Sequence, residues 1–139
     1  SKNVYLFIKK MAPCIEVVGY RQKKRGIKYL GDLSSDFGAN VKFIIGPSKN
    51  FKKIKINNLK TRILHKATKS SIYGNTNSVY KDPINSLKFV LNKLKKDNIN
   101  LGKDFYVFTG STVGVIPILN KGLYVGKISE LGSVKTKII

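Results

Sequence analysis

A single amphipathic helix is the feature that most constrains the fold of this chain. In the stretch "DPINSLKFVLNKLKKDN", apolar residues recur at three- and four-residue spacing, which is the period of one helix face. Asp82 suits the position before a helix and Pro83 suits its first turn. Lysines crowd the C-terminal turn, where the helix dipole favours cations. We therefore predict one main helix over about residues 83–96.

Short segments with strand character flank this helix on both sides. Residues 14–20 carry the β-branched residues typical of a strand, and residues 41–45 form an apolar run stopped by Gly46 and Pro47. Between them, a basic turn leads into a loop or short helix punctuated by Gly31 and Gly38. Two strands are therefore expected before residue 47.

The second half of the chain carries more strand-like segments. Residues 61–80 alternate like a hairpin, with turn chemistry around Gly74 and Asn75. Pro117 argues for an edge position or a bulge in its own strand. Four further strands are predicted: one within residues 104–111 that runs into a Thr-Gly-Ser turn, and three at residues 114–119, 123–128 and 132–139. Several strands around one helix indicate an α+β fold with a mixed or antiparallel sheet.

Length and composition indicate one cytoplasmic domain that covers residues 1–139. A chain of 139 residues that is 42% hydrophobic can build one core but is short for two. No apolar run approaches the ~20 residues of a membrane span, and the apolar centre of "SKNVYLFIKK" is too short for a signal peptide. A lone cysteine, Cys14, excludes an internal disulfide and a multi-cysteine zinc site, and we expect it to be a small core residue.

The formal net charge of +20 suggests a polyanionic partner but does not specify one. Only three of the 27 basic residues are arginines (Arg21, Arg25 and Arg62), whereas bidentate recognition of phosphate or bases favours arginine. The lysines are scattered through nearly every segment. We therefore expect weak, salt-sensitive and non-specific binding to nucleic acid.

One of the seven acidic residues stands out in this basic chain. Glu16 lies inside the small and apolar stretch "MAPCIEVVGYR", and two-residue periodicity places it on a face shared with Cys14 and Val18. It either lies on an exposed strand face or holds a cation, because burying an unpaired charge is costly. A phosphate-binding loop, a Ser nucleophile with a local base and paired carboxylates are all absent from the sequence patterns.

A resemblance to a known family extends this interpretation. Four collinear blocks resemble the C-terminal two thirds of the 2-oxopent-4-enoate hydratase and 2-oxo-3-hexenedioate decarboxylase family, in the fumarylacetoacetate hydrolase superfamily: "APCIEVVGYR", "DFGANVKFIIG", "GNTNSVYKDPINSLKFVLNKLKKDNINLGKDFYVFTGSTVGVIPI" and "LGSVKTKII". The resemblance implies a mixed β-roll with one main helix. It also implies a catabolic lyase, hydratase or decarboxylase, that acts on a small 2-oxo acid such as 2-oxopent-4-enoate. Hydratase, decarboxylase and hydrolase chemistry all stay open.

The resemblance assigns roles to five residues. Glu16 matches one of three carboxylates that hold Mg2+ or Mn2+ in the family, and such an ion polarises the carbonyl of the 2-oxo acid. Asn40 stands where the family has a serine near the substrate carboxylate, and Thr109, Gly110 and Ser111 match its substrate-binding turn. No catalytic residue is assigned.

The same resemblance predicts that the chain is an incomplete enzyme. The family's two other metal carboxylates form a Glu-x-Glu pair upstream of the Ala-Pro segment, and this chain contains no such pair. A homo-oligomer is expected, both from apolar surface left uncovered and because the family is commonly oligomeric. The alternative is a catalytically inactive basic module that attaches to nucleic acid or to a large assembly.

Overall fold

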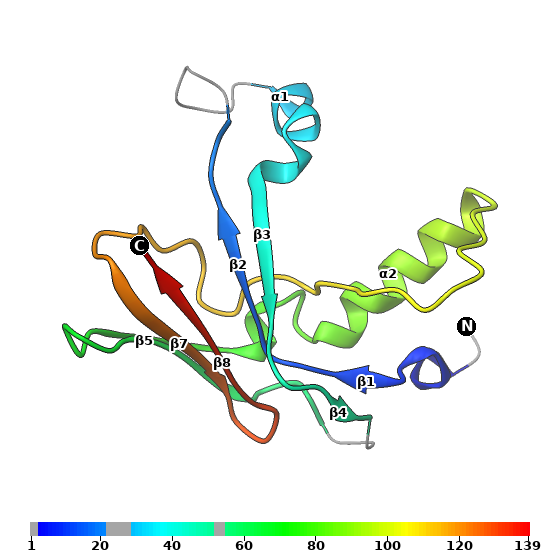
Figure 1. Ribbon diagram of the computed structural model, residues 1–139. Coiled ribbons are helices and arrows are strands. Elements are labelled where there is room, and N and C mark those ends of the chain that lie inside the picture. The colour runs from blue at the N-terminus through cyan, green and yellow to red at the C-terminus, as the bar shows by residue number, and fades with distance from the viewer. Residues whose placement is uncertain (1–2, 22–28, 52–54) are drawn as a thin grey trace.

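A computed structural model describes residues 3–21, 29–51 and 55–139 (Figure 1). The fold is mixed α+β, with antiparallel strand pairs and one main helix, as predicted. Its elements in chain order are η1 (Val4–Phe7), β1 (Lys10–Met11), β2 (Cys14–Val18), α1 (Leu30–Ser35), η2 (Phe37–Ala39), β3 (Asn40–Ile45), β4 (Lys49–Asn50), β5 (Lys60–His65), β6 (Ser71–Asn75), η3 (Thr76–Ser78), α2 (Pro83–Lys96), β7 (Gly122–Ile128) and β8 (Gly132–Ile138).

The main helix, α2, forms where the sequence predicts it. Asp82 accepts a hydrogen bond from the backbone N–H of Ile84 at 2.8 Å, which satisfies one of the free donors of the first turn. Pro83 opens the helix, and lysines occupy its last turn. Ile84 and Leu87 bury against Val4 of η1, with other half-buried apolar side chains packed around them. Burial of this face stabilises the helix, because a helix of this length is marginal alone.

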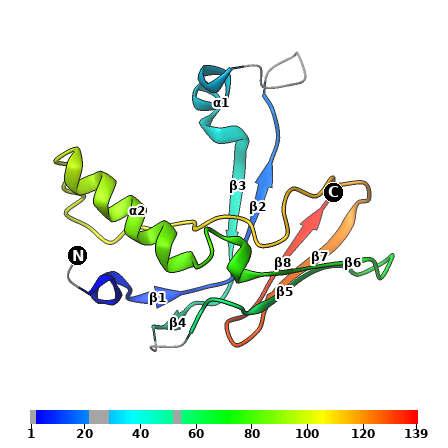
Figure 2. The ribbon, with the colours of Figure 1, turned by 180° about the vertical axis from the view of Figure 1, so that it is seen from behind.

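The described strands form three antiparallel sheets. Four strands pair in the order β6-β5-β7-β8, and β2 pairs with β3 in a separate ladder that stands away from them in both ribbon views (Figures 1 and 2). The ladder joins the larger sheet through Ile15. A Cβ placed on Gly126 of β7 would lie 3.2 Å from Cγ1 of Ile15, so the two strands approach closely there. The strand β1 precedes β2 and β4 follows β3, and these two short strands pair with each other.

Four sequence-based details are wrong. Gly74 and Asn75 lie inside β6, and the hairpin turns instead at residues 66–70, where the Thr68 hydroxyl lies 2.8 Å from Nδ1 of His65. Gly31 lies within α1 and does not end a segment. Residues 104–111 and 114–119 are not strands. They have no ladder partner among the described strands, and Pro117 lacks the N–H that a ladder requires.

The described part of the chain contains no helix that is both long and apolar enough to cross a membrane. The last two strands, β7 and β8, form where the sequence predicts strands and pair as a hairpin, with Glu130 (φ 66°) in the tight connection and Gly132 (φ 119°) at the start of β8.

Candidate functional site

The candidate site centres on Glu16 in the middle of β2. Its neighbour Ile15 points toward the larger sheet, so strand alternation turns Glu16 to the opposite face. Glu16 and Val18 are both exposed there, which makes this the more open face of the strand. The structure therefore places the carboxylate of Glu16 on an exposed strand face.

Asn40 at the start of β3 contacts Glu16 directly. Its Nδ2 donates a hydrogen bond to Oε1 of Glu16 at 2.8 Å. A β-bulge makes this contact possible, because the register shift beside Val18 brings Asn40 opposite Val18 and thus onto the face of Glu16. The structure therefore brings together two residues that lie in separate sequence blocks.

An ion pair fixes the backbone that carries Asn40. Nη1 of Arg21 donates to Oδ1 of Asp36 at 2.7 Å and to the Asp36 carbonyl at 3.1 Å, while Nη2 donates to the carbonyl of Asn40. The side chain of Asp36 is only 6% exposed. The hydrogen bond from the Arg21 guanidinium holds the pKa of the Asp36 carboxyl below its ordinary value. Arg21 and Asp36 thus act as positioning residues for Asn40 and, through it, for Glu16.

The Thr109–Ser111 segment lies near this face but does not contact the pair. Phe108 stacks on Phe43, the register partner of Glu16, with ring centroids 3.5 Å apart. Thr109, Gly110 and Ser111 follow directly, and a Cβ on Gly110 would lie 3.2 Å from Val79. Within the described ranges no hydrogen bond joins Thr109–Ser111 to Glu16 or Asn40.

The hydroxyl of Ser111 is used within its own loop. It donates to the carbonyl of Gly114 at 2.9 Å and accepts a long hydrogen bond from the N–H of Val113 at 3.4 Å. The backbone carbonyl of Thr112 accepts from the N–H of Asn75, which attaches the loop to β6. The loop is therefore held in place by contacts that leave its other backbone groups at the surface.

Two other reactive side chains have structural roles in this fold. Cys14 is half-buried, and burial raises the pKa of its thiol, which disfavours the nucleophilic thiolate. His65 is 4% exposed, and its ring nitrogens lie 2.8 Å from the Thr68 hydroxyl and 3.0 Å from the Lys121 carbonyl. Cys14 lies two residues from Glu16 on the same strand face, but its raised pKa disfavours reaction, whereas the ring of His65 is held within the four-stranded sheet.

The residues present do not fit a complete divalent-cation site by themselves. Mg2+ requires about six oxygen ligands in near-octahedral geometry. Glu16 supplies one carboxylate, and across the ranges that the structure describes no three His, Cys, Asp or Glu side chains gather in one place. The Asn40 amide faces Glu16 as a hydrogen-bond donor and so occupies one of its carboxylate oxygens.

Sequence reasoning missed three contributors to this site: Asp36, Phe43 and Phe108. Asp36 is one of only seven acidic residues in the chain and lies in the quoted "DFGAN" block, which was the available signal. The Phe43–Phe108 stack joins residues 65 positions apart, and no local pattern predicts such a pair.

No known protein-family model matches this sequence, and a search of curated proteins finds no significant match.

Proposed function

We propose that this chain is part of a lyase of the hydratase or decarboxylase type that acts on a small 2-oxo acid, with a roll-like fold of the fumarylacetoacetate hydrolase kind. The observation that supports the proposal is the 2.8 Å hydrogen bond between Asn40 and Glu16. These two residues belong to separate sequence blocks, and the proposed site requires them to be adjacent.

The side chains have distinct roles in the proposed site. Glu16 presents its carboxylate on an open face, and the hydrogen bond from Asn40 fixes its orientation. The stacked rings of Phe43 and Phe108 provide an apolar wall beside it. The exposed backbone around Gly110 offers N–H donors for the carboxylate of the substrate.

A magnesium or manganese ion in this site would need further oxygen ligands. Glu16 is one carboxylate, so the remaining ligands come from the substrate and from groups outside the described residues. Such an ion would polarise the substrate carbonyl. The chain's own residues orient the substrate and hold the carboxylate of Glu16 in place.

The test uses Mn2+ as a paramagnetic probe, with oxalate as the 2-oxo acid analogue. In 15N-labelled protein, Mn2+ with oxalate should broaden the side-chain amide signals of Asn40 and the backbone signal of Gly110. Glu16→Ala should abolish this broadening, whereas Glu130→Ala, the same change at an exposed turn, should retain it. Identical broadening in both variants would overturn the proposal.

We also propose that the chain self-associates. Large apolar side chains such as Leu30 (79% exposed) and Leu119 (80%) lie on the surface, and uncovered apolar groups favour association. Light scattering coupled to size exclusion measures the mass directly, and a strictly monomeric chain at all concentrations would refute the idea.

A further inference from the structure

A pocket on the outer side of α2 lies apart from the Glu16 site. It has a volume of about 490 Å3 and is lined by Tyr80, Lys81, Asn85, Lys88, Phe89 and Asn92. This is in the size range of small-ligand sites. Its walls combine aromatic rings, lysine amines and side-chain amides, and no acidic residue lines it.

Helical periodicity explains why these residues share a surface. Asn85, Lys88, Phe89 and Asn92 are spaced by three and four residues, so they line one stripe of α2. The buried residues Ile84 and Leu87 lie on a neighbouring stripe that packs against Val4 of η1. From Asn85 to Asn92 the helix rises by about 10 Å, which sets the length of this stripe.

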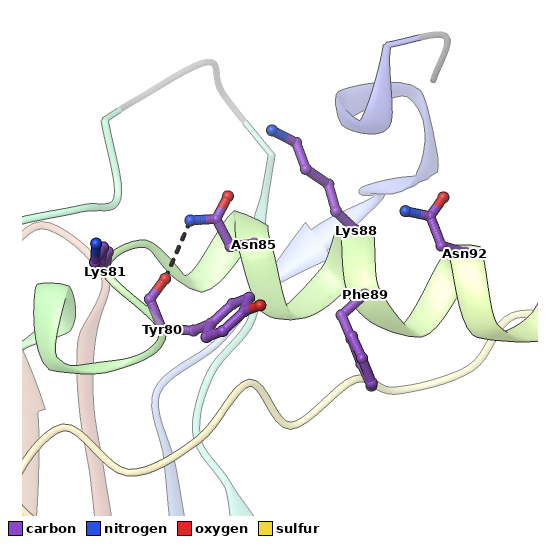
Figure 3. Close-up of a pocket in the computed structure, with 6 residues that line it drawn as sticks. All are labelled: Tyr80, Lys81, Asn85, Lys88, Phe89 and Asn92. Atoms are coloured by element: carbon purple, nitrogen blue, oxygen red, sulfur yellow. Dashed lines mark hydrogen bonds between the residues drawn. The ribbon is translucent and has the colours of Figure 1, made fainter.

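The two kinds of side chain line opposite edges of the pocket. Figure 3 shows Asn85, Lys88 and Asn92 along one edge of the helix and the rings of Tyr80 and Phe89 along the other. The rings are open to solvent, with exposed fractions of 67% for Tyr80 and 63% for Phe89. Exposed aromatic faces are the surfaces on which unpaired bases stack.

The ring of Tyr80 sits on a backbone that is held in place. Nδ2 of Asn85 donates to the Tyr80 carbonyl at 3.0 Å. Tyr80 (φ 48°) and Lys81 (φ 64°) both adopt the left-handed region, which is unfavourable for residues other than glycine. The contact with Asn85 therefore helps to fix the turn that carries both a ring and a cation into the pocket.

We propose that this pocket binds single-stranded nucleic acid. Bases would stack on Tyr80 and Phe89, phosphates would contact Lys81 and Lys88, and the Asn92 amide would hydrogen-bond base edges. Charge complementarity favours this partner, because the chain carries a net charge of +20. Base-paired duplexes do not offer their base faces to exposed rings, so single strands are preferred. The proposal is independent of the lyase function.

The first experiment reports stacking directly. The chain has no tryptophan, so Phe89→Trp introduces a single fluorophore into the pocket. An oligothymidylate of about ten nucleotides, within the usual range of single-strand sites, should quench its fluorescence. Phe37→Trp, at another exposed phenylalanine outside the pocket (82% exposed), should show much weaker quenching. Equal quenching in the two variants would overturn the proposal.

A second experiment separates stacking from general attraction to a basic protein. Phe89→Ala should weaken binding of the oligomer about tenfold or more, because each stacked base contributes substantially, whereas Phe37→Ala should leave it unchanged. Lys88→Gln should reduce the slope of log K against log[salt] by about 0.7, and Lys135→Gln, on the exposed side of β8, should change it little.

Three results would refute the assignment. Equal affinities of Phe89→Ala and Phe37→Ala for the oligomer would mean that it is held only by the net positive charge of the protein. Equal quenching by thymidine monophosphate and by the oligomer, at the same nucleotide concentration, would indicate a mononucleotide site. A preference for duplex DNA of the same length would exclude stacking on unpaired bases.

Discussion

Replacing Gly74 with alanine tests how the loop that carries Thr109–Ser111 is attached to the sheet. Gly74 lies in β6, where the chain of the loop passes directly over it. A Cβ at this position would lie 2.0 Å from the carbonyl oxygen of Thr112 and 2.8 Å from Cγ1 of Val113. Real Cβ contacts essentially never fall below 3.0 Å, so backbone must move by about 1 Å.

Two effects determine how much Gly74→Ala destabilises the fold. Overpacking of this size destabilises by about 1–3 kcal/mol. Moving the loop also weakens the hydrogen bond from the Asn75 N–H to the Thr112 carbonyl, 3.2 Å long in the native chain, which contributes about 1 kcal/mol. We therefore expect Gly74→Ala to lower the free energy of unfolding by about 2–4 kcal/mol.

The assay is urea unfolding followed by far-UV circular dichroism, with amide spectra of Gly110 recorded in parallel. Gly31→Ala is the matched control, because Gly31 lies in α1 with no atom within 4 Å of an added Cβ. That change should be neutral or stabilising by up to about 1 kcal/mol. Unfolding of both variants at the same urea concentration, with an unchanged Gly110 signal in Gly74→Ala, would contradict the inference that the loop packs closely on β6.

Three further changes probe the scaffold. Leu87→Ala should destabilise the fold by about 2–5 kcal/mol in chemical denaturation, because it empties the core that α2 shares with η1; an effect no larger than that of Phe89→Ala on the exposed stripe would contradict this. Asp82→Ala should cost about 0.5–2 kcal/mol by removing the cap of α2, seen as a lower Tm, and an unchanged Tm would refute the capping role. Arg21 lowers the pKa of Asp36 below its ordinary value, so ionised Asp36 stabilises the fold above about pH 4 and this contribution disappears as the pH falls through the lowered pKa. A plot of Tm against pH should therefore fall more steeply in acid for the wild type than for Asp36→Asn, and parallel curves would exclude the effect.

Local patterns predict the elements whose causes are local. The bounds of α2 follow from its cap, its proline and its apolar period, and β7 and β8 follow from alternation across a tight turn. The prediction of a turn near Gly74 is wrong because a glycine is required there for close packing and not for a turn. It allows the chain at Thr112 to approach β6, a contact between residues 38 positions apart that no short window reveals.

The same limit applies to the candidate site. The proximity of Glu16 and Asn40 is consistent with the site that the resemblance implies, but the bulge that makes the contact is visible only in the ladder. Residues 104–111 have the composition of a strand, but none of the described strands pairs with them. Their apolar residues are used otherwise, as in the stack of Phe108 on Phe43.

The net charge of +20 cannot distinguish the two proposed sites, because a positive field attracts a 2-oxo acid and a polynucleotide alike. Screening limits that field to about 8–10 Å at physiological salt, so the groups in each site decide what stays bound. Glu16 lies in β2 and Phe89 lies on the exposed stripe of α2, and variants at independent sites have additive effects. A Glu16→Ala, Phe89→Ala double variant should therefore lose oxalate and oligonucleotide binding independently. A non-additive loss would mean that a bound strand reaches the face of Glu16 and that the two sites form one surface.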